Sequence, residues 1–418
     1  MRLTCLIAAA TLALAAPAMA QKARIEVQYP LGFIFDPVFK DIKTEFEKVH
    51  PEYEVFYRPA YKEYEDAAQT ALRQSITKQL PDVSFQAINL QRLFVDRGIA
   101  QDIGPFIAQE KDWKGQGYSD SMMALGTFGG KPYGLAFAFS TPIIYFNEDL
   151  VRKAGADPEN FPNTWDGIFD LSKKIQALGS DTVGMYHSWT ITGNWMWQAL
   201  VMSYGGTMMS ADEKKVAFDG PGGQNAIDLM GRMIGEAKMP NLAHEAARQS
   251  FFAGKVGIWT ESTSLLRVAD DGVGGKFKWR TAVFPVPAAD GRLPTGGAAA
   301  LMFAATPEKQ KGAWAFMKFI SGADGATIMV KGSGYMPPNS LPADDPNRLK
   351  PFYATKPNHL TSLKQQKYMT PWYAFPGDNG LKIIAVIKDH LQSVVDGSTP
   401  PRGALAAMTK DVQALIPK

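Results

Sequence analysis

Strand-like and helix-like patterns alternate along the chain, and this alternation limits its fold more than any other feature. Residues 24–29, 53–57 and 80–85 read as strands. The two segments between them, 36–50 and 61–78, repeat apolar side chains at three- and four-residue spacing. Strands that alternate with helices pair in parallel through right-handed crossovers. We therefore predict an α/β fold, with further helices at 165–178, 194–204, 223–237, 309–320 and 381–395.

The start of the first helix decides where the first aromatic residues lie. Asp36 followed by Pro37 is a typical helix start, because aspartate caps helices and proline is favoured at their first position. Tyr29, Phe33 and Phe35 would then lie in a glycine-containing loop after the first strand. Loops on a rigid scaffold often carry function, so we expect these three rings to line a ligand cleft.

The N-terminus reads as an export signal. Arg2 precedes an apolar stretch over 3–16, and Ala18-Met19-Ala20 is a small-residue cleavage site. An uncleaved anchor is the alternative, but a span needs ~20 apolar residues. We expect cleavage after Ala20 and a periplasmic location. Cys5 is the only cysteine, so the mature chain would have neither a disulfide nor a lipid anchor.

The charge balance argues against a nucleic-acid partner. Of 44 Lys and Arg residues only Arg2 lies in the signal, which leaves 43 basic against 41 acidic side chains. Nucleic-acid binders usually carry a strongly basic face, whereas this chain mixes its signs throughout. We expect no such partner.

Polar and aromatic side chains follow the predicted strands. Ligands bind beyond the carboxyl ends of strands in open α/β sheets. Sugars suit aromatic planes combined with hydroxyl and amide groups. We expect ligand contacts from Gln86 and Asn89 after the third strand and from Thr260, Ser262 and Ser264 after the strand near 258.

Tryptophans near 194 could offer a stacking surface. Trp195 and Trp197 lie two residues apart and cannot share one helical face. We therefore expect at most one of them to face a ligand, and core packing is the alternative for each.

Catalytic and metal signatures are missing from the sequence. His50, His187, His244, His359 and His390 are scattered without metal-ligand spacing. No phosphate-binding loop and no G-x-S-x-G motif occurs. We expect no catalytic residue, no metal and no cofactor. Spacing alone leaves a glycoside hydrolase with paired carboxylates open as an alternative.

An ordered set of short motifs carries a family resemblance. Residues 129–135 (GGKPYGL) and 140–147 (STPIIYFN) are the most specific. Weaker ones follow the family order: 46–51, 80–83, 153–155, 162–165, 252–258 and 334–337. The chain resembles the extracellular solute-binding proteins of family 1, which are receptors of carbohydrate-type ABC importers.

The resemblance implies a type II binding-protein fold, in which two lobes close on a ligand around a hinge that the chain crosses several times. We place crossings near 139–141, 285–296 and 335–338. The N-terminal lobe would comprise 21–139 and 290–336, and the C-terminal lobe 140–289 and 337–418. Closure would be a hinge motion.

The resemblance also implies a ligand, partners and site residues. We expect a monomer that delivers a sugar or polyol to membrane permease subunits. Implied contacts are Tyr61, Ser140 with Thr141, Ser262 or Ser264, Gly296-Gly297 and Tyr335.

Receptors for glycerol phosphate or its diesters are the second reading. They carry a glutamate where this chain has 87–89 (AIN), and an arginine where it has 375–379 (FPGDN). Without that arginine the bidentate phosphate fork is lost. We expect Asp378 and Asn379 to supply a polar contact in its place, and an ordinary turn at 376–380 is the alternative.

Overall fold

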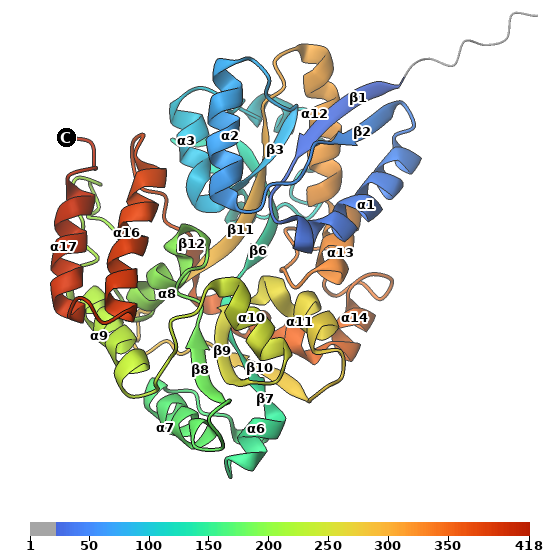
Figure 1. Cartoon of the computed structure of the whole chain (residues 1–418). Helices are drawn as coiled ribbons and strands as arrows, with labels where there is room; N and C mark the ends of the chain where they lie inside the picture. Colours follow the sequence, from blue (N-terminus) through green and yellow to red (C-terminus); the bar gives the residue numbers. More distant parts are fainter. Residues whose placement is uncertain (1–21) are drawn as a thin grey trace, which may run out of the picture.

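The computed structural model describes residues 22–418, so the predicted export signal lies outside the described residues. Two β-sheets lie one beyond the other along the molecule (Figure 1). No helix of the described chain is long and apolar enough to cross a membrane. The larger sheet contains β1 (Ala23–Gln28), β2 (Tyr53–Tyr57), β3 (Val83–Ala87), β6 (Gly134–Ser140), β11 (Leu293–Met302) and β12 (Met369–Pro371). The smaller sheet contains β7 (Pro142–Asn147), β8 (Val183–His187), β9 (Val256–Ser262) and β10 (Trp279–Val283).

The first part of the chain confirms the predicted parallel pairing. Strand β1 pairs in parallel with both β2 and β3, and α1 (Gly32–Val49) and α2 (Tyr64–Ile76) connect them. Strand β11 then pairs antiparallel with β3 and β6. Other helices of this region are α3 (Gln91–Asp96), α4 (Gly104–Ile107), α5 (Asp120–Ala124), α12 (Pro307–Ser321) and α13 (Ala323–Gly332), with a hairpin of β4 (Thr127–Phe128) and β5 (Lys131–Pro132).

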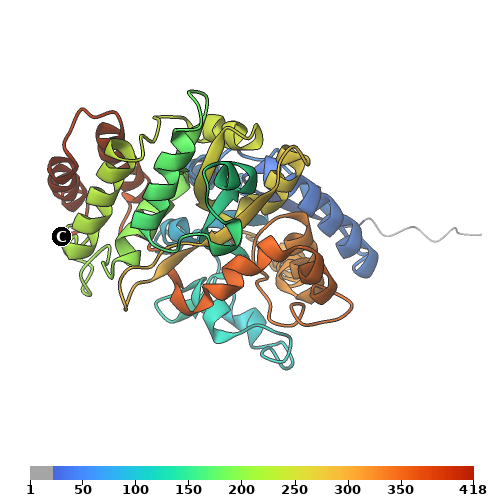
Figure 2. The same ribbon diagram turned by 90° about the horizontal axis from the view of Figure 1, so that it is seen from below.

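Helices surround the smaller sheet and extend to one side of it. Helices α8, α9, α16 and α17 pack on one another. They form a group at the end of the molecule opposite α1 (Figure 2). The bounds of the helices in this region are α6 (Glu148–Lys153), α7 (Trp165–Gln176), α8 (Trp195–Ser203), α9 (Pro221–Gly235), α10 (His244–Phe252), α11 (Leu266–Val273), α14 (Lys350–Thr355), α15 (Leu360–Lys364), α16 (Gly380–Val395) and α17 (Pro401–Gln413). Short 3-10 turns lie at 88–90, 158–160, 192–194, 263–265, 357–359 and 366–368.

The chain passes between the two sheets at two of the places where the resemblance implied crossings. Only Thr141 separates β6 from β7, and 284–292 link β10 to β11. Near the third crossing, the Met336 backbone N–H donates to the Phe139 carbonyl at 2.8 Å. The late strand β12 pairs with β11 of the larger sheet, although the sequence placed it in the C-terminal lobe.

The first helix begins earlier than predicted, at Gly32, because Leu31 takes a left-handed conformation with φ 57° that starts it there. Pro37 therefore lies inside α1, where it lacks the N–H that would reach the Phe33 carbonyl. Arg267 Nη2 from α11 lies 3.3 Å from this carbonyl oxygen and donates to it. The carbonyl oxygen that Pro37 leaves without a helical donor thus receives a hydrogen bond from the other half of the molecule.

Candidate functional site

A cavity of about 1010 Å³ lies between the two sheets. The start of α1, the first turns of α2, the end of β6 and part of β11 contribute to its wall from the larger sheet. The end of β9, the start of α10, the segment 189–195 and α16 contribute from the other half. Both halves therefore supply residues to one site.

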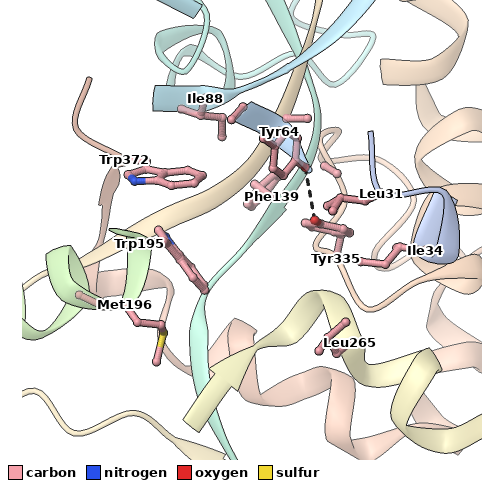
Figure 3. Packing of buried hydrophobic residues seen from close by; sticks show 14 of the residues in the cluster. Leu31, Ile34, Tyr64, Ile88, Phe139, Trp195, Met196, Leu265, Tyr335 and Trp372 are labelled. Atoms are coloured by element: carbon pink, nitrogen blue, oxygen red, sulfur yellow. Dashed lines mark hydrogen bonds between the residues drawn. The ribbon is translucent and has the colours of Figure 1, made fainter. Parts of the chain in front are cut away.

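Aromatic rings form much of the inner wall. Trp195 and Trp372 lie with their ring centroids 6.3 Å apart, and Trp195 Nε1 donates to the Pro294 carbonyl at 3.0 Å. On the other side, the hydroxyls of Tyr64 and Tyr335 lie 3.5 Å apart. Figure 3 shows Trp372 close to Trp195, and Tyr64 joined to Tyr335 by a hydrogen bond. Such faces can stack on the C–H surface of a sugar ring.

A carboxylate joins the two halves at the cavity wall. Glu65 on α2 accepts hydrogen bonds from Thr192 Oγ1 at 2.5 Å and from the Gly193 backbone N–H at 2.6 Å. Gly193 has φ 63°, and a Cβ there would lie 2.3 Å from Trp372 Cζ2. The sharp turn that presents these donors therefore requires glycine.

A histidine–glutamate pair lies on the wall from the smaller sheet. His244 Nε2 lies 2.7 Å from Glu261 Oε2, and the Ser262 backbone N–H donates to Glu261 Oε1 at 2.7 Å. Glu261 is fully buried. Burial alone would lower the pKa of His244, but the charge of Glu261 and the hydrogen bond to it outweigh burial and raise that pKa.

Basic side chains reach the cavity from three elements. The Arg248 guanidinium of α10 lies over the Phe33 ring at 4.4 Å and pairs with Glu245. Lys62 and Lys388 line the rim and are exposed. Within 22–418, no group of three His, Cys, Asp or Glu side chains is arranged to hold a metal ion.

A match to a known protein family identifies the family of this chain. Residues 41–360 match the family model described as bacterial extracellular solute-binding protein. The chain belongs to this family. Among curated relatives, the sn-glycerol-3-phosphate-binding periplasmic protein UgpB of Escherichia coli (strain K12) is 25% identical over 329 residues, or 75% of this chain and 71% of that protein. UgpB of Rhizobium meliloti is also 25% identical, over 66% of each chain.

Solved structures confirm the two-lobed type II fold for this solute-binding protein. UgpB from Mycobacterium tuberculosis, solved with glycerophosphocholine, has a TM-score of 0.84 at 20% identity and covers 94% of this chain and 98% of its own. Maltose-bound MalE3 of T. maritima has a TM-score of 0.81 at 19% identity, with coverage of 94% and 100%.

Several residues that the sequence singled out line the cavity of this solute-binding protein, and they come from both halves. Ser140 and Ser262 end β6 and β9, and Ser264 lies in the 3-10 turn that follows β9. Of the two tryptophans, Trp195 lines the cavity and Trp197 does not. The predicted residues that line it are Phe33, Ser140, Trp195, Ser262, Ser264, Gly296, Gly297 and Tyr335.

The prediction of an aromatic loop after β1 is wrong, because α1 begins at Gly32 and includes Phe33 and Phe35. Tyr29 is buried, with its ring stacked on Phe39 at 4.1 Å and its hydroxyl donating to Asp36 at 2.8 Å. Phe35 is buried against Tyr335, ring centroids 5.5 Å apart. Neither lines the cavity, so the expectation of three cleft aromatics reduces to Phe33.

The polar residues expected near the strand ends are also displaced into internal contacts. Gln86 is fully buried and donates to Ser84 Oγ at 2.8 Å. Thr260 Oγ1 lies 2.6 Å from His187 Nδ1, and Thr141 Oγ1 accepts from Gln365 at 3.1 Å. Each side chain is committed to a neighbour in the core and lies off the cavity wall.

Three further predicted residues, Tyr61, Trp197 and Asn89, do not line the cavity. Tyr61 pairs through its backbone, its N–H donating to the Tyr29 carbonyl at 3.0 Å. Trp197 packs edge-on against Phe218, centroids 6.3 Å apart. Asn89 lies directly behind the cavity wall, where its Nδ2 would be 2.8 Å from a Cβ at position 193.

Asp378 and Asn379, which we expected to make a ligand contact in place of the family's arginine, do not line the cavity. Asp378 is 69% exposed and pairs with Arg97, 3.1 Å from its Nε. Asn379 donates to the Leu415 carbonyl at 2.8 Å. Both side chains form contacts at the surface near α16 and α17, so neither offers the polar ligand contact that we expected.

Several cavity residues carry no signal in the sequence that marks them as part of a site. Glu63 is the N-cap of α2 and Glu65 lies in its first turn, and acidic residues are common at both places for helix-capping reasons alone. Glu261 follows a buried strand and His244 begins a helix, with no motif to join them. Trp372 lies in a segment without periodicity, and only the three-dimensional fold brings it to Trp195.

Proposed function

We propose that this solute-binding protein captures a sugar or polyol between its two lobes and delivers it to the permease of an ABC importer. The observation that carries the proposal is the cavity itself, which both halves of the chain line with aromatic rings and serine hydroxyls. Its volume of about 1010 Å³ is at the upper end of the roughly 300–1,000 Å³ usual for small-molecule sites.

The chemistry of the wall suits a hydroxyl-rich solute. Trp195 and Trp372 offer ring faces, and Ser140, Ser262 and Ser264 offer hydroxyls that both donate and accept. Gly296 and Gly297 lie on the same wall, and Gly296 lies close to the side chains of Ser140 and Trp195.

Lobe closure is the proposed mechanism. With the boundaries expected from the sequence, 21–139 with 290–336 forms one lobe and 140–289 with 337–418 the other. A ligand that contacts both lobes binds the closed form better and shifts the population toward it. We further propose that the exported chain acts in the periplasm as a non-catalytic monomer after cleavage behind Ala20.

A glycerol phosphate or one of its diesters is the second candidate ligand. The names of the UgpB relatives favour it. Lys388 lines the cavity and forms no ion pair with any residue of the described chain, so it could meet a phosphate. Against this candidate, carboxylates outnumber permanently charged cations on the wall.

Titration calorimetry tests the proposal. The panel comprises mono- and disaccharides, polyols, glycerol 3-phosphate and glycerophosphocholine, each at low and high salt. The expected result is saturable binding of a neutral sugar or polyol with little salt dependence. Tight, salt-sensitive binding of glycerol 3-phosphate would favour the second candidate. If no solute bound and a glycoside were hydrolysed instead, the binding-protein function would be wrong.

A further inference from the structure

Phe33 is an exposed aromatic residue that two helices of the other half of the molecule contact. It lies in the first turn of α1, which joins β1 to β2 of the larger sheet, and it is 45% exposed. The Arg248 guanidinium of α10 lies 4.4 Å from the centre of its ring. Arg267 of α11 donates from Nη2 to its backbone carbonyl at 3.3 Å. Both arginines belong to helices that flank β9 of the smaller sheet, and these helices lie below α1 in Figure 1.

Arg267 makes a second contact across the same boundary. Its Nε donates to the Gly332 carbonyl at 2.6 Å, and Gly332 is the last residue of α13, which packs on α1. Asp271, one turn further along α11, accepts from Nη1 at 2.6 Å and orients the guanidinium. Because Pro37 has no N–H, the Phe33 carbonyl has no helical donor and is free for this arginine. One side chain beside the smaller sheet thus binds two carbonyls of the half that contains the larger sheet.

The contact between Arg248 and Phe33 lies where a cation–π interaction is effective. Only 11% of the Arg248 side chain is exposed, and aromatic faces attract cations more strongly where water is excluded. Phe33 and Arg248 both line the cavity, whereas Arg267 does not. Arg267 can therefore act on the closed form without touching a solute.

We propose that Phe33, Arg248 and Arg267 form a clasp that holds the two halves of the molecule in the closed form. The inference rests on the proposed function, capture by lobe closure, and names positioning residues that keep a solute enclosed. Separation of the halves would break the cation–π contact and both hydrogen bonds of Arg267 across the boundary. The clasp therefore raises the closed fraction whether or not a solute is bound.

Distances between spin labels on the two halves test the clasp without any solute. Residues 22–418 contain no cysteine, so Ile76→Cys on α2 and Asp389→Cys on α16, both at exposed positions, place one label on each half. Pulsed electron paramagnetic resonance then separates short distances, from the closed form, from long ones. Phe33→Leu and Arg267→Met should each lower the ratio of short to long distances about fivefold, the scale of one cation–π contact.

A second exposed phenylalanine provides the matched control. Phe56 is 43% exposed, and the Arg24 guanidinium lies 3.7 Å from the centre of its ring, but both residues belong to the paired strands β1 and β2. Phe56→Leu should therefore leave the ratio unchanged. Phe33→Leu combined with Arg248→Met should lower the ratio by less than the product of the two single effects, because both substitutions remove the same contact.

The same labels are read again with maltose and with sn-glycerol 3-phosphate as solute probes. A probe that binds should raise the short-distance fraction, and Arg267→Met should still lower it. An unchanged ratio in Phe33→Leu and Arg267→Met, an equal fall in Phe56→Leu, or a parent protein without short distances in every condition would overturn the clasp. If the ratio fell as expected but no solute of the calorimetric panel bound, the clasp would stand and the proposed function would not.

Discussion

The Glu65 carboxylate accepts the backbone N–H of Gly193 at 2.6 Å, across the boundary between the two halves of the molecule. Thr192 Oγ1 donates to the same carboxylate. Because Gly193 also lies against Trp372 in the cavity wall, this contact couples the relative position of the halves to the shape of the site. A ligand that binds there acts on the same segment that holds the halves together.

Glu65→Gln should weaken the contact between the halves. Hydrogen bonds to charged groups contribute about 1.5–3 kcal/mol each, so the open form should gain population without ligand. Thr192→Val removes the other side-chain partner. In a double-mutant cycle on the midpoint of urea unfolding, the two changes should be less than additive. Full additivity would mean that Glu65 and Thr192 are not energetically coupled.

Gly193→Ala should destabilise the protein and distort the cavity. A left-handed conformation costs a non-glycine residue about 1–2 kcal/mol, and the new Cβ would lie 2.3 Å from Trp372 Cζ2. Gly235→Ala is the matched control, because no atom lies within 4 Å of a Cβ there and its φ is not positive. Urea unfolding should show a loss at 193 and no loss at 235. A stable Gly193→Ala protein with unchanged ligand affinity would contradict this account of the turn.

Asp378→Asn should leave ligand affinity unchanged. The side chain is 69% exposed and pairs with Arg97 outside the cavity, and exposed ion pairs contribute only about 0–1 kcal/mol to stability. Ser140→Ala, at the cavity wall, should by contrast weaken binding by about 1–3 kcal/mol if its hydroxyl meets the ligand. Calorimetry on both variants separates the two positions. A large loss of affinity in Asp378→Asn would restore the role first expected from the sequence.

The His244–Glu261 pair should make stability depend on pH. The pKa of His244 is raised in the folded protein above its ordinary 6.5, so the contribution is complete below about pH 6.5. It is lost as pH rises through the folded pKa, because the folded histidine then also releases its proton. The difference in unfolding free energy between wild type and His244→Gln should therefore be larger at pH 5.5 than at pH 9. A difference that grows with pH would contradict the pairing.

The sequence predicted the α/β fold because apolar periodicity and the alternation of strands with helices are local patterns, whereas the crossings between lobes came from the family resemblance. It placed the start of α1 wrongly because Asp36–Pro37 is a strong local signal, yet Leu31 starts the helix earlier and Arg267 from α11 satisfies the carbonyl that Pro37 leaves free. Local rules cannot anticipate a donor from α11.

The cavity was only partly predictable for the same reason. Ser140, Ser262 and Tyr335 lie in family motifs or at strand ends, so the sequence could point to them. Trp372 reaches the wall only because its segment packs against Trp195, which is distant in the sequence. Nothing in the immediate neighbours of Glu63 or Trp372 distinguishes them from capping or core residues.

Solution X-ray scattering, with and without the solute that binds best in calorimetry, tests capture between the lobes most directly. The account predicts a smaller radius of gyration at saturating solute than in its absence, and a larger ligand-free radius in Glu65→Gln than in wild type, with both proteins converging when solute is bound. A radius of gyration that does not change at saturating solute in either protein would contradict capture by lobe closure.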